Sequence, residues 1–343
     1  MNRDNFPSSI RVDLEIAYSE GMKAVPDTSY TKLIEIVPST SNSKIEVFYG
    51  DQPRMRRWRG ERQAQTFNEY KMNINSDQWE LTKSFKRKDF ANDQSGGRLM
   101  QKAKEFGTEF ELSKQQEFFE FLRNGASIMG FDKANLYDFN HRYVTSSGAT
   151  ISAVAAQSNM NLGGSALDAA TLQLERAAYA QYVTDKNQKW GLQLTDILVY
   201  QGSANHKAAM ELNNSSFTVE ANTVKGTMTE NVFKGSFNIM TTVYGLGTTD
   251  WISFALNFPQ FKPVKVLSET VNPGFDNPRF TTLGLEPSNE SSESFYRGEV
   301  AMGIEANFDY NPGYWFTTIL HGSSSYSFTP LNNESQRVLY PNI

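Results

Sequence analysis

The chain has 343 residues, of which 39% are hydrophobic and 21% are charged, so it can bury a core and is long enough for two domains. It contains no cysteine, which excludes disulfide bonds, thiolate metal sites and cysteine nucleophiles. The net charge is −5, and no stretch approaches the roughly 20 apolar residues of a membrane span, so we expect a soluble protein without a membrane partner.

The first part of the chain predicts an arm followed by a projecting hairpin. We expect residues 1–45 to form the arm, with one short helix between residues 12 and 21. Residues 46–84 carry apolar side chains at alternate positions, as strands of a long β-hairpin do: Tyr70, Met72, Ile74, Trp79 and Leu81.

The most unusual segment lies between residues 54 and 62. It holds five arginines around one tryptophan: Arg54, Arg56, Arg57, Trp58, Arg59 and Arg62. A cationic segment of this kind cannot form a core, and guanidinium groups bind carboxylates and stack on aromatic rings, so the segment indicates a partner. The partner is either nucleic acid or another copy of the chain, and a solvated loop without a partner is the third alternative.

Two observations favour another copy over nucleic acid. The basic charge is confined to this segment while the rest of the chain is acidic, which suits contact between a basic element and an acidic neighbouring surface. A site for single-stranded nucleic acid would need more aromatic platforms than the segment offers. We therefore expect an intersubunit contact with glutamates on the next helix: Glu105, Glu109 and Glu117.

Residues 85–125 contain the longest predicted helix, over residues 93–124. Its apolar stripe has spacings typical of one helix face: Leu99, Ala103, Phe106 and Phe110. About 30 residues would span roughly 45 Å. Gly107 disfavours the middle of this helix by about 1 kcal/mol, so packing must hold it. We expect the stripe to pack on the long strand described below, through Val300, Met302, Ile304 or Phe308.

Residues 126–263 indicate an α/β region. A helix is expected to open at Ser165, with Asp168 completing a capping-box-like start. Its predicted apolar face holds six residues: Leu167, Ala170, Leu174, Ala177, Ala178 and Tyr182. A buried strand over residues 194–200, a short helix over 203–212 and strands over 232–242 and 251–258 follow.

Residues 264–322 contain the clearest strand of the sequence. Over residues 296–310 apolar side chains occupy the even positions and polar ones most odd positions, which indicates an antiparallel strand with one wet face. A second strand is expected over residues 315–320. Residues 323–343 form a C-terminal tail of open role.

The sequence offers no convincing catalytic or cofactor site. His141, His206 and His321 are far apart and lack metal-ligand spacing. His141 near Asp138 is a candidate general base, but a structural polar contact is the preferred interpretation. Gly163–Ser165 indicates a plain turn, since no Walker or dinucleotide motif accompanies it. We predict no enzyme, no metal and no cofactor.

Four stretches together resemble the major head subunits of Mu-like tailed phages, which have the Hong Kong 97 capsid fold. The first, PRMRRWRGER at residues 53–62, is similar to the family's finger pattern, Pro-x-Met-Arg-x-Trp-x-Gly-x-Arg. The others stand in family order: residues 79–82 with 87–93, residues 137–141, and residues 261–266 with Tyr314–Trp315 and Leu320–Gly322.

This resemblance implies an α+β shell protein that assembles as hexamers and pentamers around double-stranded DNA, without reading its sequence. It implies an N-terminal arm (1–45), an extended E-loop (46–84), a peripheral domain with the spine helix (85–125), a mainly axial domain (126–263), and peripheral strands with a return (264–322). Separate scaffold and portal proteins would be partners, and a decoration protein is a further candidate partner. The shell would be assembled in a bacterial cytoplasm and end as the virion capsid.

Two other functions stay open at this point. A bacterial encapsulin shares the fold but encloses a cargo enzyme. A DNA-binding protein could use the arginine segment directly, and would then bind DNA with strong salt dependence.

Overall fold

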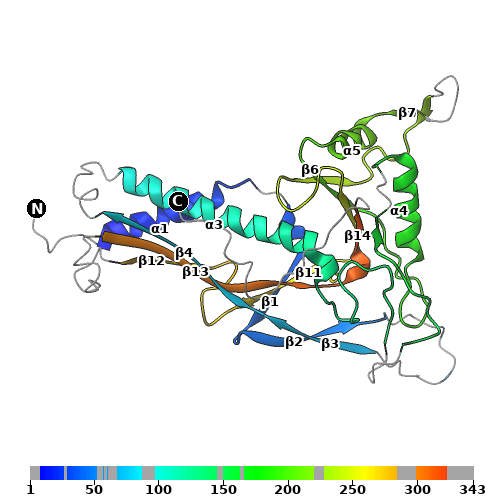
Figure 1. Cartoon of the computed structure of the whole chain (residues 1–343), viewed down its shortest axis with the longest axis horizontal. Helices are drawn as coiled ribbons and strands as arrows, with labels where there is room; N and C mark the ends of the chain where they lie inside the picture. Colours follow the sequence, from blue (N-terminus) through cyan, green and yellow to red (C-terminus); the bar gives the residue numbers. More distant parts are fainter. Residues whose placement is uncertain are drawn as a thin grey trace, which may run out of the picture.

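Two β-sheets form the framework of the molecule, one in an elongated part and one in a second part beside it (Figure 1). This computed structural model describes residues 8–26, 29–51, 57, 60, 68–86, 97–144, 150–162, 166–219, 228–283 and 299–322. The fold is mixed α+β within these residues, as the sequence predicted.

The first sheet is built around one long central strand. Its strands are β1 (Ile34–Ser39), β11 (Val264–Glu269), β13 (Glu299–Pro312), β12 (Arg279–Leu283) and β4 (Asp77–Lys86). β1 runs parallel to β11, and all pairs with β13 are antiparallel. Residues 34–39, which we expected in a free arm, are therefore part of this sheet.

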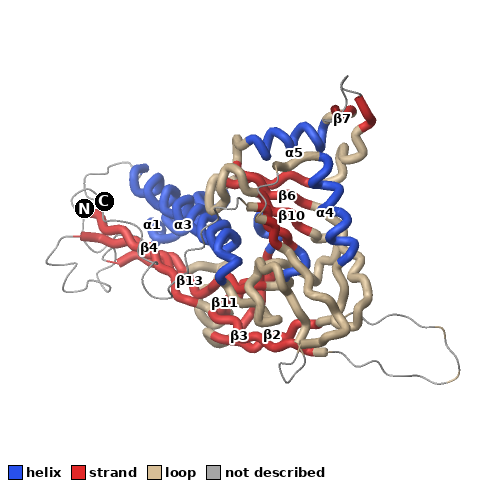
Figure 2. Tube along the Cα trace, turned by 45° about the vertical axis from the view of Figure 1, so that its right-hand side comes forward, coloured by secondary structure: helices blue, strands red, loops and turns tan. Residues whose placement is uncertain are grey.

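Strand β13 has one buried and one partly open face, as its alternating sequence predicted. The even positions are buried: Met302, Ile304, Ala306, Phe308 and Tyr310. Helices α1 (Ser8–Lys23) and α3 (Gly97–Arg123) lie over this face (Figures 1 and 2). Tyr18 of α1 stacks on Phe280 at 5.0 Å, and Phe118 of α3 meets Tyr310 edge-on at 5.6 Å.

Helix α3 buries Ala103, Phe106 and Phe110, while Leu99 is partly buried. Its most extensive neighbour is α1, and Phe118 and Phe121 near its C-terminal end lie against Tyr310 of β13. Phe106 lies edge-on to Phe280 of β12 at 6.5 Å, and the expected packing of the stripe on Val300, Met302, Ile304 or Phe308 stays a prediction.

The two helices cross at glycines. A Cβ at Gly107 would meet the carbonyl oxygen of Tyr18, and a Cβ at Gly21 would meet that of Lys104. The Thr108 hydroxyl donates to the Gly21 carbonyl at 3.0 Å across the same crossing. Gly107 therefore weakens α3 intrinsically but allows the backbones of α1 and α3 to touch.

The second sheet belongs to the region between residues 126 and 263, with one strand from further along. Its strands are β5 (Met160–Asn161), β14 (Thr318–His321), β10 (Trp251–Phe254), β6 (Asp196–Tyr200) and β9 (Asn238–Thr242). Helices α4 (Ala169–Gln181) and α5 (Ala204–Asn214) flank it. β14, from the segment 264–322, thus lies in this sheet next to β10 and β5.

Short elements complete the fold. The hairpin β2 (Ser43–Tyr49) and β3 (Glu69–Asn75) rests on the first sheet, and β7 (Phe217–Val219) pairs with β8 (Met228–Glu230). Among the described residues, 3₁₀ turns also link elements: η1 (Tyr30–Leu33), η2 (Asn124–Ser127) and η4 (Trp315–Thr317).

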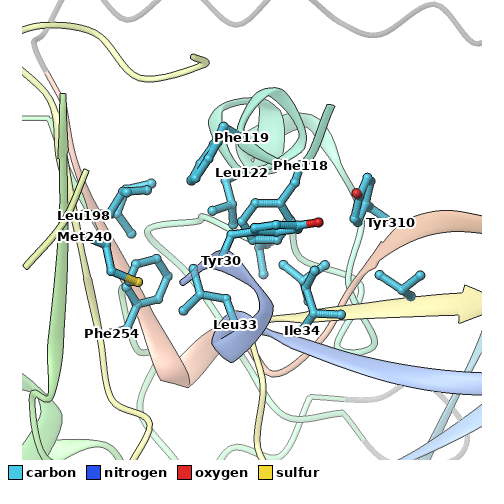
Figure 3. Close-up of a cluster of buried hydrophobic side chains, with 14 of the residues drawn as sticks. Tyr30, Leu33, Ile34, Phe118, Phe119, Leu122, Leu198, Met240, Phe254 and Tyr310 are labelled. Carbon is cyan, nitrogen blue, oxygen red and sulfur yellow. The ribbon is translucent and has the colours of Figure 1, made fainter. Parts of the chain in front are cut away.

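One continuous core joins the two parts of the molecule. Figure 3 shows where it passes between them, with η1 under the C-terminal end of α3 and facing the second sheet. The buried side chains come from η1, from α3 and from the second sheet: Tyr30, Leu33, Phe118, Phe119, Leu122, Leu198, Met240 and Phe254.

Helix α4 differs from its predicted form. It begins at Ala169 with Asp168 as its N-cap, whose carboxylate accepts from Thr171 N at 2.7 Å, while Ser165 lies outside the described residues. Leu174, expected in the core, is 70% exposed. The buried face holds Leu172, Glu175 and Tyr179. Glu175 can be buried because polar side chains inside the molecule contact its carboxylate, as described below.

We predict that Gly107→Ala destabilises the subunit by about 1–3 kcal/mol, the usual range for an overpacked contact. At an exposed helix position the same change would stabilise by up to about 1 kcal/mol, so the sign reports the close crossing. Thermal unfolding of the soluble subunit measures it, with Ser113→Ala on the exposed side of α3 as the near-neutral control. A Gly107→Ala subunit as stable as the parent would contradict the crossing.

Candidate assembly site at the root of the basic finger

The basic finger, residues 51–67, emerges from the end of the β2–β3 hairpin. The hairpin pairs from Ser43 opposite Asn75 to Tyr49 opposite Glu69. One further hydrogen bond, from Gly50 N to Asn68 O at 3.4 Å, closes the root of the finger. The finger is therefore attached to the molecule at Gly50 and Asn68.

The turn around Asp185, from a distant part of the chain, is hydrogen-bonded to this root. Asp185 N donates to Gly50 O at 3.0 Å, and the Asp185 carboxylate accepts from Asn68 Nδ2 at 2.7 Å and from the Tyr70 hydroxyl at 3.4 Å. A Cβ at Gly50 would meet both the Asp185 carboxylate and the Tyr70 ring, so only glycine fits.

The local sequence shapes the gripping turn. The Thr184 hydroxyl accepts from Lys186 N at 3.3 Å and from Gln188 N at 3.2 Å, and Asn187 adopts a positive φ of 58°. Asparagine tolerates that conformation better than most residues. These contacts aim Asp185 at the finger root.

The root carries more negative than positive charge. Asp51 and Asp185 are both buried, and Lys186 forms an ion pair with Asp51. One oxygen of each carboxylate, Oδ1, has no hydrogen-bond partner in the described part of the chain. Burial raises the pKa of Asp185 above its ordinary value, and the nearby Asp51 charge adds to this effect. Burial and the Asp185 charge also raise the pKa of Tyr70.

The structure places one of the predicted finger residues. Arg57 is exposed. The others lie outside the described residues: Arg54, Arg56, Trp58, Arg59 and Arg62. The intersubunit role of all six therefore stays a prediction.

Two of the glutamates expected to receive the finger have partners within their own subunit. Lys102 pairs with Glu105 at 2.6 Å, and Lys83 of β4 pairs with Glu109. The pairing with Lys102 lowers the pKa of Glu105. These glutamates are therefore weaker candidates for a neighbour's arginines than the sequence alone suggested.

His141, the candidate general base, is enclosed. It is fully buried, with Nδ1 2.7 Å from Asp132 Oδ2 and Nε2 2.9 Å from Asn159 Oδ1, and its ring stacks on Trp315 at 4.1 Å. Asp138, its neighbour in sequence, accepts from Asn140 N instead. The imidazole ties two segments together and has no open side for a substrate, which is the structural contact preferred above.

A second buried cluster was not found from the sequence. Glu175 of α4 accepts a hydrogen bond from Ser253 of β10 at 2.8 Å and lies 2.6 Å from Nε2 of His321 on β14, whose ring stacks on Trp251 at 3.7 Å. Serine and histidine both contact the carboxylate and not each other, so the histidine cannot activate the serine as in a catalytic triad. The three residues of this cluster lie at positions 175, 253 and 321, and no short spacing in the sequence predicts that they meet.

Two further findings bear on function. Among the described residues there is no group of three or more His, Asp or Glu side chains that could hold a metal ion. No helix in the described ranges is both long and apolar enough to cross a bilayer.

Comparisons with known proteins point to one class. The family model described as Mu-like prophage major head subunit gpT matches residues 8–166. No curated protein matches the chain. Among solved structures it is similar to a chain of Mycobacterium phage Patience, at 12% identity and a TM-score of 0.50, over 96% of this chain and 90% of that one.

Two other solved structures are similar at lower scores. The procapsid of bacteriophage JBD30 shares 14% identity at a TM-score of 0.48, over 91% of this chain and 73% of that one. A virus-like particle from Pyrococcus furiosus shares 12% identity at 0.44, over 90% and 98%. These scores carry no argument, so the structural likeness rests on the Patience chain and concerns the fold.

We predict that Asp185→Asn stabilises the subunit at pH 7. Because the pKa of Asp185 is raised in the folded state, its ionisation opposes folding, and this penalty is complete above the raised pKa. The advantage of the variant should shrink as the pH falls through the raised value, and vanish below about 3.9, the pKa of an unperturbed aspartate. Thermal unfolding between pH 3 and pH 8 measures it.

Asp51→Asn is the matched control, since it removes an equal charge but also the ion pair with Lys186, and it should not stabilise. A less stable Asp185→Asn subunit at pH 7 would mean that the charge-assisted bonds from Asn68 and Tyr70 outweigh desolvation.

Proposed function

We infer that this chain is the major capsid protein of a tailed phage head. Its residues 8–166 match the family model of the Mu-like prophage major head subunits, and its mixed α+β fold is similar to that of the Patience phage chain. The observation that carries this function is the family match. It covers α1, the hairpin with its basic finger, and α3, which are the elements that a shell subunit would use.

We propose that copies of the chain assemble as hexamers and pentamers into an icosahedral shell around double-stranded DNA. Separate scaffold and portal proteins would direct assembly in the bacterial cytoplasm, and a decoration protein is a further possible partner. In this proposal residues 46–84 are the E-loop, residues 85–125 the spine of the peripheral domain, and residues 126–263 mainly the axial domain.

The proposal needs no catalytic chemistry, metal or cofactor. The polar clusters around His141 and Glu175 are buried and join separate segments of the chain, which suits a structural protein. The overall charge of −5 also suits a shell whose inner surface binds DNA weakly and without sequence preference.

Particles purified after expression with the cognate scaffold test this function. We expect closed shells by negative-stain electron microscopy, and DNA inside shells taken from infected or induced cells. A monomer that stays monomeric beside scaffold and portal would contradict it. Shells filled with a cargo enzyme would instead support the encapsulin alternative, and tight salt-dependent DNA binding by the monomer would support the DNA-binding alternative.

We predict that replacing Arg56, Arg57 and Arg59 together with alanine abolishes assembly but not folding. A finger at a subunit boundary loses its charge-assisted hydrogen bonds, while the core of its own subunit is untouched. Circular dichroism of the subunit and sedimentation of the assembly reaction measure the two effects. The triple lysine variant keeps the charge, and should assemble partially. Normal shells from the alanine variant, with or without reduced DNA content, would place these arginines elsewhere.

A further inference from the structure

The outer side of helix α1 carries an uncovered apolar pair. Val12 is 51% exposed and Ile16 is 53% exposed. They lie one helical turn apart, so their side chains are neighbours on one face of the helix. The inner side of the same helix buries Leu14 and Tyr18 against the rest of the subunit. Helix α1 therefore offers more apolar surface than its contacts within the described residues cover.

An acidic side chain lies beside this pair. Asp13 is exposed, and no ion-pair partner for it occurs in the part of the chain that the structure describes. Glu20, further along the helix, differs in this respect, because it lies 3.8 Å from Lys104 of α3. A segment that covers Val12 and Ile16 would therefore be favoured if it combined apolar side chains with a cation.

The C-terminal tail of the chain has this combination. Residues 323–343 lie outside the described residues, but their sequence is mostly polar and uncharged. Its longest apolar run is Val338, Leu339 and Tyr340, and Arg337 directly precedes it. The only other charged side chain of the tail is Glu334. One compact group thus offers both parts that the outer side of α1 would bind.

The tail begins in the second sheet, on the side of the molecule that meets the C-terminal end of α3. Gly322 N donates to the Asn161 carbonyl at 3.0 Å, directly after β14. A Cβ at Gly245, just after β9, would meet the carbonyl of Phe119 in α3. β14 and β9 are three strand spacings apart in the sheet, about 14 Å.

Helices α1 and α3 run in the same direction along the elongated part (Figure 1). Tyr18 lies at Gly107, and further along both helices Gln115 donates to the Pro26 carbonyl at 3.3 Å. Val12 therefore lies beyond the helix crossing as seen from the second sheet.

The tail is long enough for this path. From Phe119 through the crossing to Val12 the path follows 18 helical residues, about 27 Å, and the sheet brings the whole path to about 40 Å. Val338 is 16 residues beyond Gly322, and an extended segment of that length spans up to about 53 Å. A subunit's own tail can therefore reach its own α1.

We propose that residues 337–340 of the chain's own C-terminal tail dock on the outer side of α1. The apolar run covers Val12 and Ile16, and Arg337 pairs with Asp13. This contact joins the two ends of the chain and holds α1 against α3 from outside. It goes beyond the shell function and does not depend on it, because it forms within one subunit.

Cysteine cross-linking of the free, full-length subunit tests the contact, because the chain has no cysteine of its own. The double variants are Ile16→Cys with Leu339→Cys and Ile16→Cys with Tyr340→Cys, since neighbouring residues of an extended segment point to opposite sides. After mild oxidation, free thiols are counted and tryptic peptides are identified by mass spectrometry. We expect at least one of the two variants to form an internal disulfide at the mass of a monomer.

The control replaces Ile16→Cys by Leu174→Cys, a 70% exposed side chain on α4. The next residue of α4, Glu175, contacts His321 close to the start of the tail, so a tail that does not dock would meet Leu174→Cys at least as often. We expect the control disulfide to form at least five times more slowly.

Three results would overturn the docking. One is an equal or faster disulfide with Leu174→Cys. Another is a pair of reactive thiols that stay unpaired in both Ile16→Cys variants. The third is a disulfide that links two subunits, which would show that a second copy's tail occupies the helix. Each of these results leaves the shell function untouched.

Charge reversal gives an independent measurement in the same assay. Asp13→Arg should slow disulfide formation by roughly two- to fivefold, the effect of losing one exposed ion pair, and Arg337→Asp in the same chain should restore the rate. Glu211→Arg on α5 is the control reversal at another exposed position, and should leave the rate unchanged. An unchanged rate for Asp13→Arg would contradict the placement of Arg337 beside Asp13.

Discussion

The two-faced strand β13 is the constraint on which the rest of the structure depends. Its even side chains are buried under α1 and α3, so they fix where both helices lie. Its odd side chains cannot share that core, because successive residues of a strand point to opposite sides. One strand of 14 residues therefore creates the core of the elongated part and, on its reverse, the surface left for contacts.

Buried ionisable side chains hold the pieces around this strand in place. Lys114 of α3 bonds Glu111 at 2.9 Å and the Phe275 carbonyl at 3.1 Å, and Lys265 bridges the sheet to the hairpin. In the second sheet Glu175 and His321 do the same between α4 and β14. Burying a charge is costly unless it is paired, so each of these contacts specifies one arrangement of its neighbours. Buried paired contacts of this kind suit a subunit that must present the same surfaces in every copy.

The sequence predicted those elements whose pattern is local. The alternation over residues 296–310 and the stripe of α3 gave the right strand and helix, because burial follows the period of each element. It failed where the determinant is a distant residue. Gly107 has a reason only once Gly21 lies against it, and Glu175 points inward only because Ser253 and His321 receive it. With Glu175 turned inward, Leu174 is exposed, whereas Leu167 and Tyr182 of the predicted face are buried as expected.

The candidate site, too, could be predicted only in part from the sequence. The arginines were visible in the sequence, but the contact of the Asp185 turn with their root joins residues more than 100 positions apart. In the proposed shell, a contact in which the finger of one copy meets a different surface of the next copy either closes into a ring or continues as a filament. Asp185 and Gly50 fix the root of the finger through close contacts, whereas the finger itself lies mostly outside the described residues. The proposed assembly therefore requires that this root be held in the same way in every copy.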